Sequence, residues 1–168
     1  MEKQIVWHVI YTKSRQEKIV AEKLGAAGYE IYLPLVKVIS QWSDRKKVVE
    51  KPLFNSYVFI KDVIDNDKIK TFNGVVGFLK YDRKLAIVHQ HEINTLKSII
   101  KHGYDVTELG NQEELVLGSR VMIMAGPLKG SVGELYANPE SEWFIIHFEN
   151  IGNSLKVKIP SKLLKKIE

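Results

Sequence analysis

The chain has no cysteine and only 5 prolines among its 168 residues. Without a thiol it cannot form a disulfide scaffold, a cysteine-ligated zinc or iron–sulfur site, or a cysteine nucleophile. No apolar run approaches the roughly 18 residues that a membrane-spanning helix needs. The N-terminal sequence MEKQIVWHVIY has neither the apolar core nor the small-residue cleavage site of a signal peptide. We therefore expect a soluble, cytoplasmic protein with no membrane partner.

Charge is distributed unevenly along the chain. Residues 1–102 contain 18 Lys/Arg and 11 Asp/Glu, a net charge of +7, whereas residues 103–168 contain 7 and 9, a net charge of −2. A basic first half and a slightly acidic second half suggest two domains with different partners. A surplus of this size also arises by chance, so charge alone leaves both interpretations open.

The first half of the chain begins with a strand pattern and a helix pattern. Residues 5–11, IVWHVIY, are rich in β-branched and aromatic side chains, which is typical of a strand. Ser14 and Glu17 have the spacing of a capping box and indicate the start of a helix that ends at Gly28. The apolar face of this helix is predicted to consist of Val20, Leu24 and Ala27.

A β-hairpin and two further helices are predicted next. Residues 30–42 indicate a strand interrupted by Pro34, and the basic segment that follows completes a hairpin whose tip is Gln41–Lys47. Helices are predicted at residues 64–72 and 91–100. The apolar face of the last helix is predicted to consist of Ile93, Leu96 and Ile100.

These patterns predict an α+β fold with two domains. Residues 1–102 would form an antiparallel sheet flanked by helices, because a hairpin interrupts the alternation of strands and helices. Residues 103–116 have two glycines, four acids and no apolar periodicity, which indicates a linker. Residues 117–168 contain four short strand patterns separated by turn residues, which predict a small all-β barrel.

No group of residues in the sequence supports catalysis. His89 and His91 are two residues apart, but no recognisable ligand spacing accompanies them, and surface histidines at a helix start are the simpler interpretation. The segment Gly126–Gly130, GPLKG, lacks the Gly-Lys-Ser/Thr ending of a phosphate-binding loop, so its glycines are better explained by a tight turn. We expect no enzyme, no metal site and no cofactor.

The hairpin tip is a candidate nucleic-acid contact. Trp42 can stack on an unpaired base, and the adjacent cations Arg45, Lys46 and Lys47 can contact phosphates. The alternative is a solvated hairpin with ordinary surface lysines and a tryptophan that packs inward. The composition of the tip does not decide between the two.

One side of the strand at residues 56–62 is aromatic. Alternation along SYVFIKD places Val58 and Ile60 on one side and Tyr57 and Phe59 on the other. If Val58 and Ile60 face the core, then a helix, the second domain or a partner protein must cover the aromatic side. An uncovered aromatic patch would be a protein-binding site.

Several stretches carry a family likeness. WHVIYTKSRQEKIVAEKL, then YLPL, KPLFNSYVFI and NGVVGFLKY, resemble the N-terminal (NGN) domain of the NusG family of transcription elongation factors. GSRVMIMAGPLKGSVGELY resembles the KOW motif of the small barrel in the same family. The hairpin sequence QWSDRKK before KPLFNSYVF is most similar to the specialised UpxY-type antiterminators of capsule operons, to which RfaH and LoaP are related.

The resemblance implies a function and two sets of site residues. It implies an operon-specific, monomeric transcription antiterminator that binds the clamp helices of the largest subunit of RNA polymerase and the non-template DNA. The implied polymerase-binding residues are Val9, Tyr11, Tyr57, Phe59, Ile93 and Leu96. The implied nucleic-acid-binding residues are Lys13, Arg15, Lys18, Gln41, Trp42, Arg45, Lys46 and Lys47. The KOW motif residues are Gly126, Pro127, Leu128, Lys129, Gly130 and Gly133.

Two other functions stay open at this point. One is a general elongation factor that couples polymerase to the termination factor Rho or to the ribosome, and the other is an RNA-binding protein that uses the KOW domain. Nascent RNA, Rho and a ribosomal protein are all candidate partners of that domain. The antiterminator function predicts that alanine at Tyr57 and Phe59 abolishes polymerase binding and leaves the fold intact.

Overall fold

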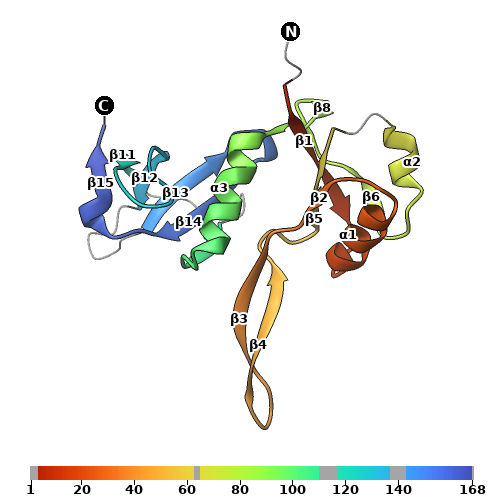
Figure 1. The fold of residues 1–168 in the computed structure, drawn as a ribbon, viewed down its shortest axis with the longest axis horizontal. Helices are drawn as coiled ribbons and strands as arrows, with labels where there is room; N and C mark the ends of the chain where they lie inside the picture. The colour runs from red at the N-terminus through yellow and green to blue at the C-terminus, as the bar shows by residue number, and fades with distance from the viewer. Residues whose placement is uncertain (1–3, 63–64, 110–116, 137–142, 168) are drawn as a thin grey trace. The chain divides into compact units, whose positions relative to one another are not determined.

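The computed structural model describes residues 4–62, 65–109, 117–136 and 143–167 (Figure 1). The chain divides into two compact units, Met1–Gln90 and His91–Glu168. Strands predominate in both units, so the predicted mixture of antiparallel sheet and few helices is confirmed. None of the described helices has the length and apolar composition needed to cross a membrane.

The first unit is built on an antiparallel sheet in the order β2-β5-β1-β6, with β9 also paired to β1. Its strands are β1 (Val6–Thr12), β2 (Ile31–Tyr32), β5 (Tyr57–Lys61), β6 (Val75–Phe78) and β9 (Val88–His89). Two separate hairpins belong to the same unit. They are β3 (Leu35–Gln41) with β4 (Lys46–Pro52), and β7 (Lys80–Tyr81) with β8 (Lys84–Leu85).

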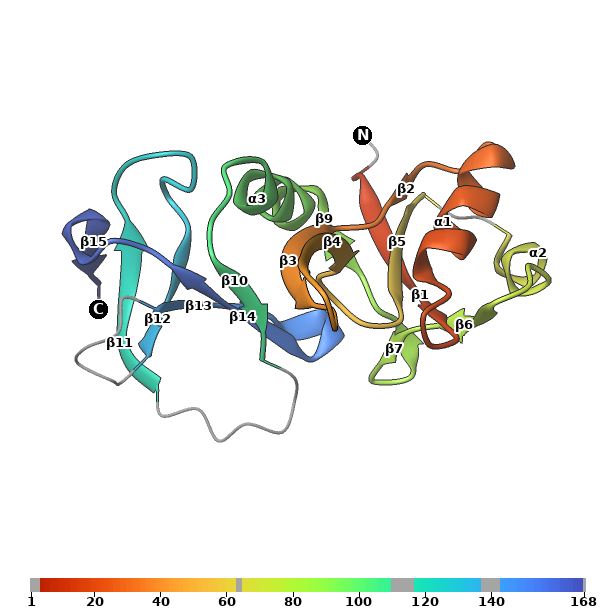
Figure 2. The ribbon, with the colours of Figure 1, turned by 90° about the horizontal axis from the view of Figure 1, so that it is seen from below.

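Two helices, α1 (Glu17–Ala26) and α2 (Asn66–Lys70), cover one face of this sheet (Figure 2). The fully buried part of the core between these helices and the sheet is aliphatic, and burying each such side chain contributes about 1.5–3 kcal/mol. The prediction that Val58 and Ile60 face the core is confirmed. The fully buried residues of this cluster are Ile10, Val20, Leu24, Val58, Ile60 and Ile69.

The start of α1 differs from the sequence-based expectation. The N-cap residue is Gln16, which makes no side-chain capping bond, so the predicted capping box of Ser14 and Glu17 is wrong. Glu17 is instead drawn into a tertiary contact, described below. The end of the helix is as predicted, since Gly28 has a φ of 95° and stops it in the left-handed region. Ala27, predicted to lie on the apolar face, is exposed.

The second unit is built on a six-stranded antiparallel sheet in the order β10-β14-β13-β12-β11-β15. The strands are β10 (Val106–Glu108), β11 (Leu117–Ile123), β12 (Val132–Tyr136), β13 (Trp143–Phe148), β14 (Asn153–Lys158) and β15 (Leu164–Lys166). Two short 3₁₀ turns, η1 (Glu149–Ile151) and η2 (Ser161–Leu163), connect the last strands. Its buried residues include Val121, Ile123, Phe144, Leu155 and Val157.

The predicted closed barrel is not confirmed. The two end strands, β10 and β15, each pair with one neighbour, and no pairing among the described residues joins them to each other. Closure depends on which end strands meet, and strand periodicity carries no information about that. The four predicted strands are present, and β10 and β15 are additional to them.

The division into units differs from the predicted domain limits. Helix α3 (Gln90–Lys101) begins at the last residue of the first unit and continues in the second, whereas the sequence pattern predicts it within a domain of residues 1–102. Strand β10 lies within the predicted linker 103–116, and residues 110–116 of that linker fall outside the described residues. The buried face of α3 consists of Ile93, Leu96 and Ile99, with Ile100 only half-buried.

Candidate protein and nucleic-acid interfaces

The face of the first sheet opposite α1 and α2 is aromatic. Register places Tyr57 of β5 opposite Tyr11 of β1, and Phe59 opposite Val9 and Tyr32. Phe54, just before β5, completes a connected group of rings. Their centroids are 5.9 Å apart for Phe54–Phe59, 6.1 Å for Phe54–Tyr57, 6.2 Å for Tyr11–Tyr57 and 6.3 Å for Tyr32–Phe59. Aromatic pairs at such separations add about 0.5–1.5 kcal/mol beyond simple burial.

Exposure rises along this aromatic face. Phe59 and Val9 are completely buried, Tyr57 is half-buried, and the Tyr11 side chain is 44% exposed. The predicted polymerase-binding residues of this unit therefore separate into a core pair and an accessible pair. Because Phe59 belongs to the core, its replacement by alanine is not expected to leave the fold intact. Tyr11 and Tyr57 form the accessible pair, which we call the tyrosine pair.

The other two predicted polymerase-binding residues lie in the second unit. Ile93 and Leu96 are both fully buried on α3. Neither offers an accessible side chain.

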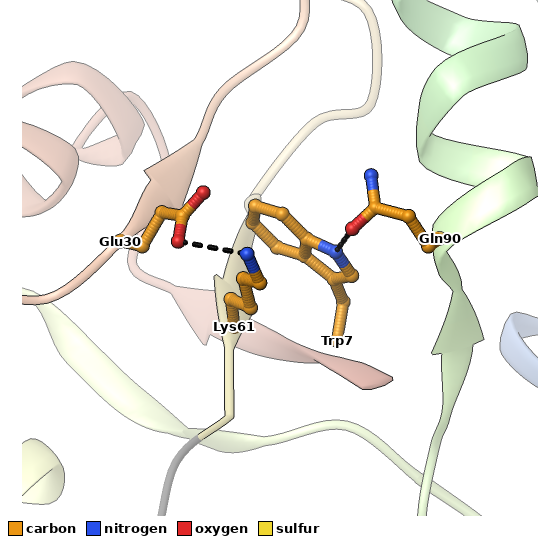
Figure 3. Close-up of polar contacts among 4 residues, drawn as sticks. All are labelled: Trp7, Glu30, Lys61 and Gln90. Atoms are coloured by element: carbon orange, nitrogen blue, oxygen red, sulfur yellow. Dashed lines mark hydrogen bonds and ion pairs between the residues drawn. The ribbon is translucent and has the colours of Figure 1, made fainter. Parts of the chain in front are cut away.

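Four residues form a polar group near the start of β1, at the end of the strand away from Tyr11 (Figure 3). Trp7 is buried, and its indole N–H donates a 2.8 Å hydrogen bond to the Gln90 side-chain oxygen. The Lys61 ammonium lies 5.9 Å from the centre of the Trp7 ring and 3.0 Å from the Glu30 carboxylate. No sequence pattern predicts this group, because its members are far apart along the chain.

The turn before β5 is held by a buried carboxylate. Glu17 is 6% exposed, and its Oε1 accepts a 2.8 Å hydrogen bond from the Ser56 backbone N–H. Ser56 has a φ of 64°, a left-handed conformation that costs a residue with a side chain about 1–2 kcal/mol. The Ser56 carbonyl in turn accepts from the Thr12 N–H at 2.9 Å. Glu17 thus fixes the backbone directly before Tyr57.

Burial also changes the chemistry of one ring on this face. Desolvation raises the pKa of the Tyr32 phenol from 10.0 to about 12. The shift delays ionisation of the phenol only in alkali, above pH 10, and the Tyr32 ring packs against Phe59 in its neutral form.

The β3–β4 hairpin extends away from the sheet (Figure 1). The sequence places three cations, Arg45, Lys46 and Lys47, at its tip. Its four-residue loop is closed by a 2.7 Å bond from the Trp42 N–H to the Arg45 carbonyl. Trp42 is 47% exposed, and the Lys47 ammonium lies 5.0 Å from the centre of its ring. The predicted inward-packed alternative for Trp42 is therefore wrong. Arg45, Lys46 and Gln41 are also exposed.

The body of this hairpin exposes an apolar pair. Ile39 lies directly opposite Val48, and their side chains are 72% and 62% exposed. Two-stranded hairpins are only marginally stable in water, so this one relies on its own cross-strand pairs. An exposed β-branched pair beside exposed cations suits contact with a ligand that is part apolar and part anionic.

The predicted cations of the first helix lie at the base of the hairpin. Arg15 and Lys18 line a cavity of about 340 Å³ together with Lys51 of β4. The Lys18 ammonium donates a 2.7 Å hydrogen bond to the Glu50 carbonyl, which ties α1 to β4. Lys13 is exposed but does not line this cavity. The predicted nucleic-acid set therefore forms a tip group and a base group.

Five of the six predicted KOW residues, at positions 126–130, lie in the turn between β11 and β12, and Gly133 lies in β12. Gly126 and Gly130 have φ values of 85° and 89°, which confirms the interpretation as a tight turn, and Leu128 is buried within it. Gly133 is required by packing, because a side chain there would meet the Ile145 carbonyl and lie 2.6 Å from the Phe144 ring. Pro127 and Lys129 complete the turn, in which the Lys129 N–H bonds the Gly126 carbonyl at 3.1 Å.

Within the described part of the chain, no group of three or more His, Asp or Glu side chains is placed to hold a metal ion. The described surfaces offer aromatic rings, cations and main-chain groups.

Comparisons with known proteins agree with the likeness seen in the sequence. The family model described as "Transcription termination factor nusG" matches residues 5–97. The structure described as "Domain interaction in Thermotoga maritima NusG" superposes with a TM-score of 0.60 at 20% identity, covering 98% of this chain and 98% of that chain. At this identity the likeness shows a shared fold.

Two conformations of the "MjSpt4:Spt5 complex" also match over 96% of this chain. They cover 98% and 97% of their own chains, with identities of 17% and 19% and TM-scores of 0.31 and 0.30. TM-scores this low carry no argument about the fold.

Proposed function

Because this chain belongs to the NusG family, we propose that it is a non-enzymatic, operon-specific antiterminator of the UpxY type that binds RNA polymerase and non-template DNA. Two surfaces of the first unit would each bind one of these partners. The tyrosine pair would contact the clamp helices of the largest polymerase subunit. The β3–β4 hairpin would contact the displaced DNA strand.

The observation that carries the proposal is the accessible tyrosine pair on an otherwise buried aromatic face. Tyr11 and Tyr57 are in edge-to-face contact, and Tyr11 presents 44% of its side chain to solvent. Tyrosines in this setting are frequent anchors in protein interfaces, because a rigid ring buries a large area at low entropic cost. Glu17 and Ser56 fix the backbone beside the pair, which reduces the cost of ordering it on binding.

The hairpin supports the nucleic-acid part of the proposal. Arg45 and Lys46 have no ion-pair partner among the described residues, so their charges are available to phosphates. Trp42 presents a ring at the same tip, and base stacking on such a ring contributes about 1–3 kcal/mol. Cations and a ring at the end of a projecting hairpin suit a single strand.

The polymerase contact is tested with Tyr11→Ala and with Tyr11→Ala combined with Tyr57→Ala. We expect each to weaken binding to purified RNA polymerase in a pull-down, the double variant most, because anchor side chains commonly contribute about 2 kcal/mol or more, a roughly 30-fold decrease in affinity. The matched control is Tyr81→Ala on β7, since Tyr81 is 55% exposed and lies off the aromatic face. Equal binding by all variants would remove the tyrosine pair from the interface.

The DNA contact is tested on a paused transcription scaffold with the hairpin variant Arg45→Gln, Lys46→Gln, Lys47→Gln. For a single strand, each phosphate that a protein neutralises adds about 0.7 to the slope of log K against log salt, so we expect removal of three cations to lower the slope by about 2. A slope that does not move would make the hairpin a purely structural element. Scrambling the non-template sequence in parallel should abolish recruitment of the wild type.

The second candidate function is a general elongation factor that couples polymerase to a termination factor or the ribosome. The description of the matching family as a termination factor favours it. It requires the tyrosine pair equally but no particular non-template sequence. Recruitment that persists on scrambled DNA would therefore support this function over the operon-specific one.

A further inference from the structure

A third surface of the first unit includes neither residue of the tyrosine pair and no residue of the β3–β4 hairpin, although Gly77 in its lining pairs with Tyr11 across β1 and β6. It is a cavity of about 500 Å³ formed by α2, β6 and the β7–β8 hairpin. Its charged lining residues are Lys70, Lys80 and Arg83, and no carboxylate of the described residues lines it. Its lining shares no residue with the cavity at the base of β3–β4.

The three cations line one cavity without an ion-pair partner among the described residues, although Asp82 precedes Arg83 and Asp67 lies in the same helix as Lys70. Lys70 ends α2, Lys80 begins β7 and Arg83 lies in the turn between β7 and β8. All three are exposed, and none has an ion pair or a side-chain hydrogen bond among the described residues. Convergent like charges repel one another, and a bound anion would relieve that repulsion.

The backbone of the β7–β8 turn positions one of the three cations. Asp82 and Arg83 form its two-residue loop with φ values of 49° and 64°. Loops with two positive φ values favour Asn and Gly, and an arginine there costs conformational free energy that a glycine avoids. Positive φ values at both positions are what a two-residue hairpin turn requires, and the turn brings Arg83 to the lining of the cavity.

The apolar residues of the lining indicate which chemical group the ligand carries beside its anionic group. Val76, Phe78 and Leu85 line the same cavity, and Val76 is 57% exposed. Apolar side chains beside three cations suit a ligand with both a flat or apolar part and a phosphate. A cavity of this size is in the range of sites for small ligands, which includes a single nucleotide.

We propose that this cavity binds a phosphate group through Lys70, Lys80 and Arg83, and that the phosphate belongs to a nucleotide. The bound nucleotide is either part of a single strand of nucleic acid or a free mononucleotide, and the test below distinguishes the two. The site goes beyond the proposed function, because it needs neither the tyrosine pair nor the β3–β4 hairpin.

The test uses the full chain carrying Arg45→Gln, Lys46→Gln and Lys47→Gln, which removes the hairpin tip's contribution. Binding of a labelled single-stranded DNA of about 12 nucleotides is followed by fluorescence anisotropy at low salt. We expect Arg83→Gly and Lys80→Gln each to weaken binding about fivefold and to lower the salt slope by about 0.7. Arg83→Gly should leave the melting temperature unchanged or higher, because glycine relieves the turn.

The matched control is Lys84→Gln, which removes the same charge next to Arg83 but does not line the cavity. It should have less than half the effect of Arg83→Gly. If the two variants weakened DNA binding equally, only the net charge of the turn would matter, and the proposed phosphate site would be wrong. Polymerase binding measured in parallel should be unchanged by Arg83→Gly, so a failure here is separate from a failure of the proposed function.

Competition distinguishes the two sources and the main rival ligand. Displacement of the strand by AMP but not by adenosine at equal concentration would support a phosphate site. Affinity for the 12-mer well above that for AMP assigns the site to a strand, and similar affinities assign it to a free nucleotide. Displacement by a polyglutamate peptide that is equally sensitive to Arg83→Gly would overturn the proposal in favour of an acidic protein partner.

Discussion

The two faces of the first unit's sheet are built on different principles. One face is aliphatic, and its residues Ile10, Val58 and Ile60 are completely buried under α1 and α2. The other face is aromatic, and its exposure rises from Phe59 to Tyr11. On the aliphatic face every residue contributes to stability. On the aromatic face the position along the strand decides whether a ring contributes to stability or to contact with a partner.

The largest expected effect is a loss of stability on replacing Phe59, which would show that part of the aromatic face belongs to the core and is not a binding surface. Phe59→Ala should lower the free energy of unfolding by about 3–5 kcal/mol, because it leaves a cavity against Phe54 and Tyr32. Urea unfolding measures the change. Tyr11→Ala, in the same assay, should cost only about 0.5–1.5 kcal/mol, which is the contribution of its edge-to-face contact with Tyr57. If Phe59→Ala were as stable as the wild type, the distinction between buried core rings and accessible binding rings on this face would be wrong.

An intermediate effect concerns the turn that leads into the aromatic face. Glu17→Ala removes the acceptor of the Ser56 N–H and should cost about 1–3 kcal/mol in urea unfolding. Glu17→Gln is the matched control, since its amide oxygen can still accept that bond. If the two variants were equally unstable, the carboxylate charge rather than the hydrogen bond would be what holds the turn.

The smallest expected effect is that of Tyr32→Phe on stability, which is absent at neutral pH and appears only in alkali. The folded protein keeps the Tyr32 phenol protonated up to a pKa of about 12, whereas the unfolded chain loses the proton near 10.0. Stability that Tyr32 contributes is therefore complete below pH 10 and is lost as the pH rises towards 12. Tyr32→Phe should match the wild type at pH 7 and lose less stability between pH 10 and 12. Identical alkaline curves would indicate that the phenol is solvated.

Local patterns predict much of this architecture. The alternation of residues 57–60 assigns each side chain of β5 to its face, because side-chain direction in a strand follows from sequence alone. The glycine stop at Gly28 and the hairpin around Trp42 are predictable for the same reason, since each depends on neighbours within a few residues. The family likeness adds the expected partners, which no local pattern can supply.

The features that sequence patterns do not predict depend on contacts between distant residues. Local spacing assigns Glu17 to a helix cap because Ser14 is near it, but its partner Ser56 is 39 residues away. Lys70, Lys80 and Arg83 are not marked by the sequence because they form no run, whereas Arg45, Lys46 and Lys47 do. The exposures of Phe59 and Tyr11 likewise depend on packing across the face, which a single strand does not encode.

The position of Trp42 at the end of the β3–β4 hairpin gives the protein an internal optical reporter. The chain has three tryptophans, of which Trp7 is buried and Trp143 is half-buried in the second unit. Water-exposed indoles emit at longer wavelengths than buried ones, so emission collected at the long-wavelength edge of the spectrum favours Trp42. A base stacked on its ring would quench that emission, and engagement of the hairpin could be timed in a stopped-flow instrument without any label.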